Sequence, residues 1–296
     1  MVYNQQSGSD YDSSKRFVLT GKALSVSTPC IMGILNVTPD SFSDGGQVRS
    51  TDEALLRIES MVHEGAGIID IGGESTRPGS DPVSVEEELN RVIPAINKAI
   101  DLFPEILFSV DTTKYEVARK ALDCGVHVVN DVSGLELEPR LAGLCAEYRA
   151  ALVIMHSQGP PETMQDSPKY RNVVTEITEF LNKKATFAKE KGVQQIIIDP
   201  GIGFGKTLQH NLEIFAQLDV FSRIGYPVMV GASRKSMIGQ ILADESGPRS
   251  VKKRLAGTLA LHYHALMHGA DILRVHDVRD TRDTLEIFKA IAKMIR

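Results

Sequence analysis

Short, almost continuously apolar runs alternate along the chain with segments of helical periodicity. The runs are CIMGILNV, GIIDIG, ILFSVD, VHVVND, ALVIMH, QIIIDPG, PVMVGAS and DILRVHD. Strands that are apolar on both faces are typical of parallel sheets covered by helices. Eight strands alternating with eight helical segments predict an α/β fold, a (β/α)8 barrel. Before them, FVLTGKALSVS predicts a short N-terminal β-hairpin.

A doubly wound open sheet is the structural alternative. We disfavour it because the first buried strand lacks the glycine-rich turn that such nucleotide-binding sheets usually carry. No linker or composition shift divides the chain after residue 20. We therefore predict a disordered N-terminal extension over residues 1–16 and one domain over residues 17–296.

Two helix starts can be predicted from local signals. Thr51 is placed as the N-cap of a helix that ends near Gly65, which leaves a long polar connection from Asn36 to about Ser50. Ser84 begins the next helix with a capping-box pattern, and the acidic run Glu86–Glu88 is expected to be a solvated helix start.

Charge and cysteine usage limit the classes of partner. The formal net charge is -5 and the pI about 5.9, which argues against non-specific attraction to nucleic acid or membranes. Three scattered cysteines, Cys30, Cys124 and Cys145, predict buried thiols in a reducing compartment. No signal peptide or membrane-length apolar run is visible. We expect a cytoplasmic protein.

Polar residues end the predicted strands, where the active face of a barrel forms. They are Asn36, Asp70, Asp111, Asn130, His156, Asp199, Ser233 to Lys235, Arg274 and His276. Any one of them is more often a helix cap or turn former, but a whole ring predicts a polar ligand over the barrel mouth. Asp111, Asn130 and Asp199 offer the acceptors and the amide that a nitrogen heterocycle needs, and Lys235 adds a donor.

A second set of residues favours anions. Arg274 and His276 are two residues apart and so point the same way on a strand, and Arg77 could add a guanidinium fork for phosphate oxygens. The alternative is a surface ion pair with Asp277 or Glu74. Late barrel strands often hold phosphate, which favours the anion site.

Three other patterns are weaker than they look. DPGIGFGKT has Pro200 where a Walker A loop needs glycine and Lys206 where a dinucleotide fingerprint needs one. Its glycines would allow close approach to a flat ligand stacked on Phe204, or would serve only the turn. The sequence predicts no metal site at His262, His264 and His268, and no G-x-S-x-G nucleophile elbow.

Seven motifs together resemble the dihydropteroate synthase family, which are pterin-binding TIM-barrel enzymes of folate biosynthesis. They are GILNVTPDSFSDGG, DIGGESTRPGS, SVDT, VNDVSG, IIIDPGIGFGKT, GASRKSMIG and ILRVHDV, in the expected order from about residue 29. The resemblance implies a transferase that joins 4-aminobenzoate to (7,8-dihydropterin-6-yl)methyl diphosphate. It also implies a sulfonamide target, a Mg²⁺ cofactor and a homodimer. The only feature of the sequence that supports a dimer interface is the apolar helix around Leu259 to Met267.

The resemblance implies a role for each matching residue. The pterin would be held by Asp111, Asn130, Asp199 and Lys235, the diphosphate by Asn36, Arg274 and His276, and Mg²⁺ by Asn36 and Asp44. Thr76 and Arg77 would lie on the second loop, and Phe42, Pro78, Phe204 and Ser236 would shape the aminobenzoate pocket, with Gly205 also binding substrate. Asp111, Asp199, Lys235, Arg274 and His276 would be the catalytic residues.

For the mechanism, our hypothesis is an SN1-like cleavage in which C–O breakage gives a pterin methyl cation that the arylamine captures. Asp111 and Asp199 would stabilise this cation, whereas an associative displacement is the competing route. The long loop that includes Ser41 to Gly46 would close over the site and exclude water; a merely disordered surface loop is the alternative.

Two rival functions resemble this one. Barrels that transfer a methyl group from methyltetrahydrofolate to a corrinoid handle no diphosphate, so TRPGS, SRK and RVHD argue against them. A non-catalytic pterin-binding partner subunit should have lost loop residues, yet Asn36, Asp44, Thr76, Lys235 and His276 are all in place.

Overall fold

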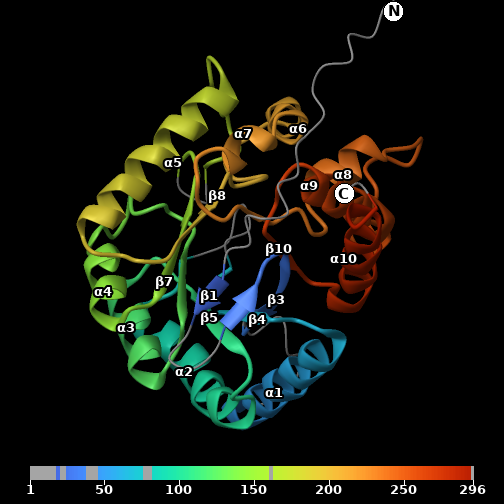
Figure 1. The fold of residues 1–296 in the computed structure, drawn as a ribbon. Helices are drawn as coiled ribbons and strands as arrows, with labels where there is room; N and C mark the ends of the chain where they lie inside the picture. The colour runs from blue at the N-terminus through green and yellow to red at the C-terminus, as the bar shows by residue number, and fades with distance from the viewer. Residues whose placement is uncertain (1–17, 21–24, 38–45, 76–81, 160–162, 295–296) are drawn as a thin grey trace, which may run out of the picture.

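Eight parallel strands form a closed barrel at the centre of the molecule (Figure 1). A computed structural model describes residues 18–20, 25–37, 46–75, 82–159 and 163–294. The barrel strands are β3 (Cys30–Asn36), β4 (Ile68–Gly72), β5 (Leu107–Asp111), β6 (Val128–Asp131), β7 (Ala151–Met155), β8 (Ile196–Asp199), β9 (Met229–Val230) and β10 (Ile272–Val275). They are ordered β8-β7-β6-β5-β4-β3-β10-β9.

The barrel closes between β8 and β9, the strands at the two ends of this order. Ile198 and Val228 form a parallel bridge there, and the amide of Ile198 donates to the carbonyl of Pro227 at 2.9 Å. The predicted (β/α)8 barrel is therefore confirmed, and the doubly wound open sheet is excluded.

Helices surround the barrel as an outer ring (Figure 1). They are α1 (Gly46–Glu64), α2 (Val85–Leu102), α3 (Tyr115–Cys124), α4 (Arg140–Tyr148), α5 (Val173–Glu190), α6 (Leu208–Ala216), α7 (Asp219–Ser222), α8 (Ser236–Ile241), the 3-10 helix η2 (Val251–Lys253), α9 (Leu255–Met267) and α10 (Val278–Ala292). With helices outside and a packed interior, each strand is buried on both faces, which explains the nearly continuous apolar runs.

Alternate strand residues divide the apolar core into two parts. The outward-facing side chains, such as Ile31, Ile69 and Phe108, pack against the helices. The inward-facing side chains fill the barrel and are Cys30, Met32, Ile68, Leu107, Val128, Ala151, Val153, Ile197, Met229 and Ile272. Further along each strand, toward its carboxyl end, the inward-facing residues become polar. The barrel interior is therefore apolar toward the amino-terminal ends of the strands and polar toward their carboxyl ends.

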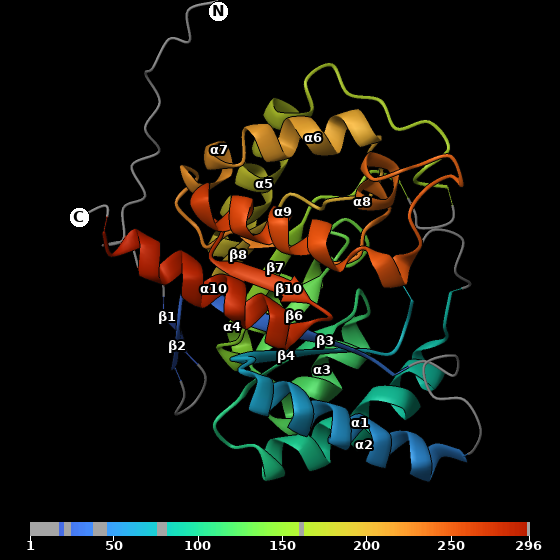
Figure 2. The same ribbon diagram turned by 90° about the vertical axis from the view of Figure 1, so that its right-hand side faces the viewer.

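The predicted hairpin is present as β1 (Val18–Thr20) and β2 (Ser25–Ser27), paired antiparallel. Val26 packs against the inward-facing apolar side chains of the barrel. Figure 2 shows the hairpin at one end of the barrel and α8 at the other. The hairpin therefore covers the amino-terminal end and leaves the carboxyl ends of the strands for the site.

Two local predictions about helix starts are wrong. Helix α1 begins at Gly46, so Thr51 is a buried position inside the helix rather than its N-cap, and the preceding connection is shorter than expected. Glu88 is fully buried against Lys114 rather than solvated, because the helical period turns it to the same side as Val92. By contrast, the side chain of Ser84 does cap α2, accepting from the amide of Glu87 at 3.2 Å.

The three cysteines are all free thiols; Cys30 and Cys145 are buried and Cys124 is half-buried. Among the helices that the structure describes, none is both long and apolar enough to cross a membrane.

Candidate active site

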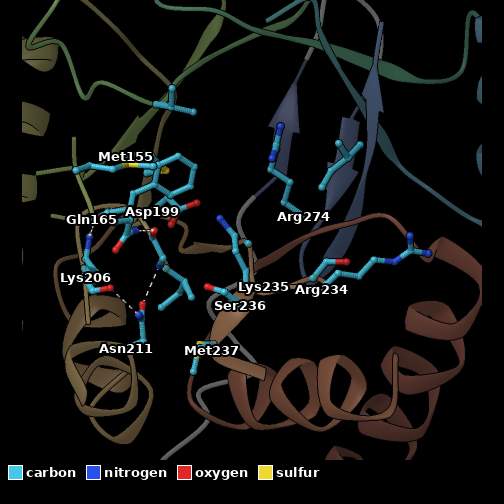
Figure 3. A pocket seen from close by; sticks show the side chains of 18 of the residues that line it. Met155, Gln165, Asp199, Lys206, Asn211, Arg234, Lys235, Ser236, Met237 and Arg274 are labelled. Carbon is cyan, nitrogen blue, oxygen red and sulfur yellow. Dashed lines mark hydrogen bonds between the residues drawn. The ribbon is translucent and has the colours of Figure 1, made fainter. Parts of the chain in front are cut away.

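A cavity of about 770 Å³ opens at the carboxyl ends of the barrel strands. Its lining includes most of the described residues that the sequence singled out, namely Asn36, Asp111, Asn130, Asp199, Phe204, Lys235, Ser236, Arg274 and His276. Figure 3 shows Asp199 and Lys206 on one side and Lys235 and Ser236 on the other, with Arg274 at the far end. Because successive inward positions on neighbouring strands meet at one level, residues distant in sequence converge here.

An arginine–carboxylate cluster lies deep in this cavity. Arg274 Nη2 donates to Asp111 Oδ2 at 2.6 Å, and its Nε donates to Asp70 Oδ2 at 2.7 Å. Asn130 Nδ2 donates to the same Asp70 oxygen at 2.9 Å. Asp70 thus orders the neighbours that face the ligand. The suggested alternative, pairing of this arginine with Asp277 or Glu74, is not what the structure contains.

Two buried acceptors of this cluster, Asp70 Oδ1 and Asn130 Oδ1, have no partner among the described residues, and of the two residues only Asn130 lines the cavity. Asn130 is 1% exposed, and its Oδ1 has no hydrogen-bond partner among the described residues. A buried polar atom without a partner costs about 1–3 kcal/mol, so a donor from a bound molecule would be favourable here. Asp199, 3% exposed, accepts from the amide of Gly201 at 2.7 Å through Oδ1.

Burial changes the proton affinities of the charged groups in the cavity. Burial raises the pKa of Asp111 to about 7, although Arg274 opposes this change. Burial also raises the pKa of Asp199. Burial and the nearby Arg274 lower the pKa of Lys235 to about 8, while Asp199 and Asp111 act in the opposite direction. The pKa values of Asp111 and Lys235 therefore lie near neutral pH, and such perturbed values are common at functional sites.

Lys235 and Phe204 form the opposite wall. The Lys235 ammonium lies 4.1 Å from the centroid of the Phe204 ring, a cation–π contact. Gly203 allows this approach, because a Cβ there would lie 3.3 Å from the Lys235 side chain and the residue has φ of +82°. The glycine-rich loop therefore brings an aromatic face to the cavity, as the sequence predicted.

The next two residues of that loop make close contacts within the protein, although Lys206 also lines the cavity. Gly205 lies behind the lining with φ of +60°, where a Cβ would come within 2.4 Å of the Gln158 carbonyl oxygen. Lys206 is 3% exposed, and its ammonium donates to the carbonyls of His156 and Phe204 at 3.2 and 2.9 Å. Burial lowers the pKa of Lys206 to about 7.

His276 lies at the rim, just beyond β10. Its ring Nδ1 is 3.0 Å from Ser233 Oγ, and its backbone amide donates to the same oxygen at 3.2 Å. The helical histidines have structural surroundings instead. His262 Nδ1 lies 3.3 Å from Thr281 Oγ1, and the rings of His264 and His268 are 4.3 Å apart.

Five predicted site residues, Phe42, Asp44, Thr76, Arg77 and Pro78, lie outside the described residues. Conversely, the cavity contains residues that the sequence reasoning missed, among them Met164, Gln165, Pro168, Asn211, Gln240 and Arg254. They come from loops and from α6 and α8, where no periodic signal marks them, and only the fold brings them to the mouth.

The described residues can contribute little to a metal ion by themselves. Within the described ranges, no cluster of three or more His, Cys, Asp or Glu could hold one. Asn36 Oδ1 and Asp111 Oδ2 do flank Gly72, where a Cβ would lie 3.8 and 3.7 Å from them. This set fits an ion carried by a substrate phosphate, since Mg²⁺ commonly takes only one or two protein oxygens.

The comparisons with known proteins agree with this geometry. The family described as "Pterin binding enzyme" matches residues 32–276. Dihydropteroate synthase of Escherichia coli K12 is 45% identical over 272 residues, which are 91% of this chain and 94% of that protein. The Yersinia pestis enzyme with a sulfonamide drug complex superposes with a TM-score of 0.86 at 40% identity, covering 94% of this chain and all of that one.

The Xanthomonas albilineans dihydropteroate synthase with 4-aminobenzoic acid gives a TM-score of 0.85 at 40% identity, covering 93% of this chain and 98% of that one. These matches cover more than nine-tenths of the chain, including the whole barrel. The chain belongs to the dihydropteroate synthase family of pterin-binding enzymes.

Proposed function

We propose that this chain condenses (7,8-dihydropterin-6-yl)methyl diphosphate with 4-aminobenzoate, giving 7,8-dihydropteroate and pyrophosphate. The observation that carries this proposal is one cavity lined both by buried acceptors and by the basic side chains Lys235, Arg274 and His276. A neutral heterocycle needs the first, and a diphosphate needs the second. Membership in a family of transferases points to the same reaction.

The pterin would occupy the deep part of the cavity. Its amino and ring N–H groups are donors, which suit the carboxyl of Asp199 and the unpartnered Oδ1 of Asn130. Lys235 would donate to an acceptor of the ring, and at a pKa of about 8 it is mostly charged at pH 7. Asp111 would be the fourth side chain that contacts the pterin.

The arylamine would lie against Phe204, with Ser236 at the first turn of α8 beside it. A flat ring gains dispersion energy from an aromatic wall. A sulfonamide shaped like 4-aminobenzoate should compete here, as in the Yersinia relative whose structure contains such a drug. Thr76, Arg77, Pro78 and Phe42 remain predicted contributors.

For the reaction, we propose that C–O cleavage precedes attack by the amine. Asp111 and Asp199 line the cavity and would stabilise the pterin methyl cation by their negative charge. Arg274 and His276 would hold the diphosphate as it departs; the guanidinium has five N–H donors, of which two bind carboxylates here. The aromatic amine is a neutral nucleophile at pH 7 and needs no strong base. Closure of the loop that contains Phe42 and Asp44 remains a prediction.

Mg²⁺ is the cofactor that we propose. Asn36 Oδ1 would hold it together with the diphosphate, and Asp44 is the second expected ligand. When bound, the ion would neutralise charge on the leaving diphosphate. Calorimetric titration of inorganic pyrophosphate with and without Mg²⁺ tests this without turnover. The Asn36→Ala variant should lose the Mg²⁺-dependent part of the affinity; an unchanged Mg²⁺ effect would refute the assignment.

A homodimer is proposed from the apolar surface of the last two helices. Helix α9 leaves Leu259, Tyr263 and Met267 half-buried. On the neighbouring α10, Ile287 (57%) and Ile291 (43%) are exposed apolar side chains, and Met294 (85%) follows just beyond the end of the helix. Exposed apolar stripes of this kind are typical of protein interfaces. Light scattering of the wild-type protein should give twice the mass of one chain. The double variant Ile287→Glu with Ile291→Glu should give the mass of a single chain.

We also propose a cytoplasmic location, supported by three thiols that are all unpaired. Cell fractionation tests it.

The assay that tests the function measures pyrophosphate release by the purified protein. It would be supplied with the pterin methyl diphosphate and Mg²⁺, with and without 4-aminobenzoate, while dihydropteroate is followed in parallel. Matched pyrophosphate and dihydropteroate formation is expected. Pterin binding without release would instead favour a methyl-transfer barrel or a non-catalytic partner subunit.

A further inference from the structure

Two connections at the barrel mouth carry the basic side chains Lys235 and His276 of the proposed site. The segment between β9 and α8 contains Lys235 and is followed by Ser236, and the turn between β10 and α10 contains His276. They are about forty residues apart in sequence but lie side by side, because β9 and β10 are paired. The relative position of Lys235 and His276 therefore depends on what joins these two connections.

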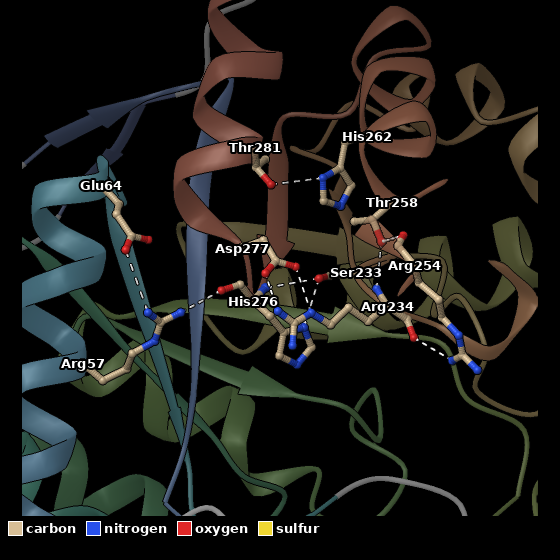
Figure 4. A network of polar contacts seen from close by, with 10 residues as sticks. All are labelled: Arg57, Glu64, Ser233, Arg234, Arg254, Thr258, His262, His276, Asp277 and Thr281. Atoms are coloured by element: carbon tan, nitrogen blue, oxygen red, sulfur yellow. Dashed lines mark hydrogen bonds and ion pairs between the residues drawn. The ribbon is translucent and has the colours of Figure 1, made fainter. Parts of the chain in front are cut away.

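Two polar links join them (Figure 4). The first is between Ser233 Oγ and His276, through the ring Nδ1 at 3.0 Å and the backbone amide at 3.2 Å. The second is a bidentate ion pair in which Arg234 Nε donates to Asp277 Oδ2 at 2.9 Å and Nη2 pairs with the other carboxylate oxygen. The Asp277 side chain is only 15% exposed. Paired planar groups of this kind fix orientation as well as distance.

The backbone at Arg234 is held in an unusual conformation. Its φ is +58°, which costs a non-glycine residue roughly 1–2 kcal/mol and needs support from its surroundings. The amide of Arg234 donates to Thr258 Oγ1 at 3.1 Å, and its carbonyl accepts from Arg254 Nη1 at 3.0 Å. The next residue, Lys235, returns to an extended conformation with φ of -61°.

This geometry separates two neighbouring cations. Figure 3 shows Lys235 directed into the cavity, while Arg234 extends away from it, toward its partner Asp277. The turn that contains Asp277 is held from a third direction, since Arg57 Nη2 of α1 donates to the carbonyl of His276 at 3.0 Å. The Arg234 guanidinium is thus engaged by protein even though the residue borders the cavity.

We propose that Arg234 and Asp277 are positioning residues that fix Lys235 and His276 relative to one another for binding of the pterin diphosphate. Neither is a catalytic residue in this proposal. It rests on the proposed function for the identity of the ligand. The competing assignment is that Arg234 binds the diphosphate itself.

The test uses Asp277→Asn, Arg234→Met, Arg234→Lys and the double variant Asp277→Asn with Arg234→Met, in the full chain. Asp219→Asn is the matched control, because Asp219 forms an exposed ion pair with Arg223 at 2.7 Å on α7. For each variant, KM and kcat are measured with the pterin methyl diphosphate, and the unfolding midpoint by circular dichroism.

Misplacement of the cations should raise KM for the diphosphate substrate between about 10-fold and 100-fold in both Asp277→Asn and Arg234→Met. The double variant should be no worse than the worse single variant, since both remove one link. Arg234→Lys should recover part of the loss, and Asp219→Asn should behave as wild type.

Three results would overturn the proposal. A much larger loss in Arg234→Met than in Asp277→Asn, with additive effects in the double variant, would assign Arg234 to the diphosphate directly. A lowered unfolding midpoint with unchanged KM would make the pair merely structural. An unchanged KM and midpoint would give it no role. If the wild-type protein has no synthase activity, calorimetry with inorganic pyrophosphate applies the same comparison, so failure of the function is distinguishable.

Discussion

Replacing Arg274 by methionine should destabilise the barrel in a strongly pH-dependent way. The substitution keeps most of the side-chain length but removes the two charge-assisted hydrogen bonds to Asp70 and Asp111, at 2.7 and 2.6 Å. Such bonds contribute roughly 1.5–3 kcal/mol each, which gives about 3–6 kcal/mol. Breaking one side of a buried ion pair costs a similar 3–5 kcal/mol. We therefore expect a loss of about 4 kcal/mol at a pH where Asp111 is fully ionised in the variant as well.

The sign of the pH dependence follows from the stranded carboxylates. The pKa of Asp111 is already raised to about 7 by burial, and loss of Arg274, which lowers it, would raise it further. A free-energy loss of about 4 kcal/mol corresponds to about three pKa units. A carboxyl with a raised folded-state pKa stabilises the fold at low pH, and this stabilisation is lost as the pH rises through that pKa. The deficit of Arg274→Met should therefore be larger at pH 8 than at pH 5, by roughly 1.4 kcal/mol for the one pH unit above the wild-type pKa of about 7.

Urea unfolding at pH 5 and pH 8, followed by circular dichroism, measures this difference. Arg223→Met is the matched control, because it removes an exposed arginine from its ion pair with Asp219 and should cost less than about 1 kcal/mol at either pH. A deficit of equal size at both pH values would refute the assignment of the energy to buried carboxylates. It would point to lost packing of the arginine stem instead.

Three further predictions concern single side chains. Gly205→Ala should lower the unfolding midpoint by several degrees, because φ is +60° and the new Cβ would meet the Gln158 carbonyl oxygen at 2.4 Å; an unchanged melting curve would contradict the backbone fit. Burial lowers the pKa of His262 in the folded protein to about 4, so the wild-type protein should lose stability as the pH falls from 6.5 to 4. His262→Gln should remove this loss, and urea unfolding at pH 6.5 and pH 4 measures it. Phe204→Leu should raise KM for 4-aminobenzoate severalfold while leaving pterin affinity nearly unchanged. Steady-state kinetics measures the KM and calorimetry measures the pterin affinity. Equal losses in both would mean that the main role of Phe204 is to hold Lys235.

The barrel and the level of its site were predictable because both depend on short-range pattern. Apolar runs of four to eight residues alternating with helices leave few other folds, and a polar residue at the end of each run lies at the same rim. Asp111, Asn130 and Asp199 line the cavity for that reason. Helix boundaries were less predictable: Thr51 has the chemistry of a cap, yet the residues before it continue the helix.

Charge partners were the least predictable feature. Glu88 belongs to an acidic run that reads as solvated, but Lys114 from the next strand–helix connection lies 2.5 Å from it. Arg234 belongs to the SRK segment, which the sequence associates with a diphosphate, but its charge partner is Asp277. No local sequence pattern predicts either pairing, because each joins charged residues that are far apart in the sequence and meet only in the folded chain.

The local pattern of this chain is enough to specify the strands, the helices around them and the chemical kinds of side chain at the mouth, because hydrophobic periodicity acts over a few residues. The tertiary structure alone decides that Arg274 joins Asp70 and Asp111 across 204 and 163 residues, and that Asn130 keeps an open acceptor. Closing the barrel brings these groups out of water together. At that depth each charge must find a partner or change its proton affinity, so the electrostatics of the site come from the fold.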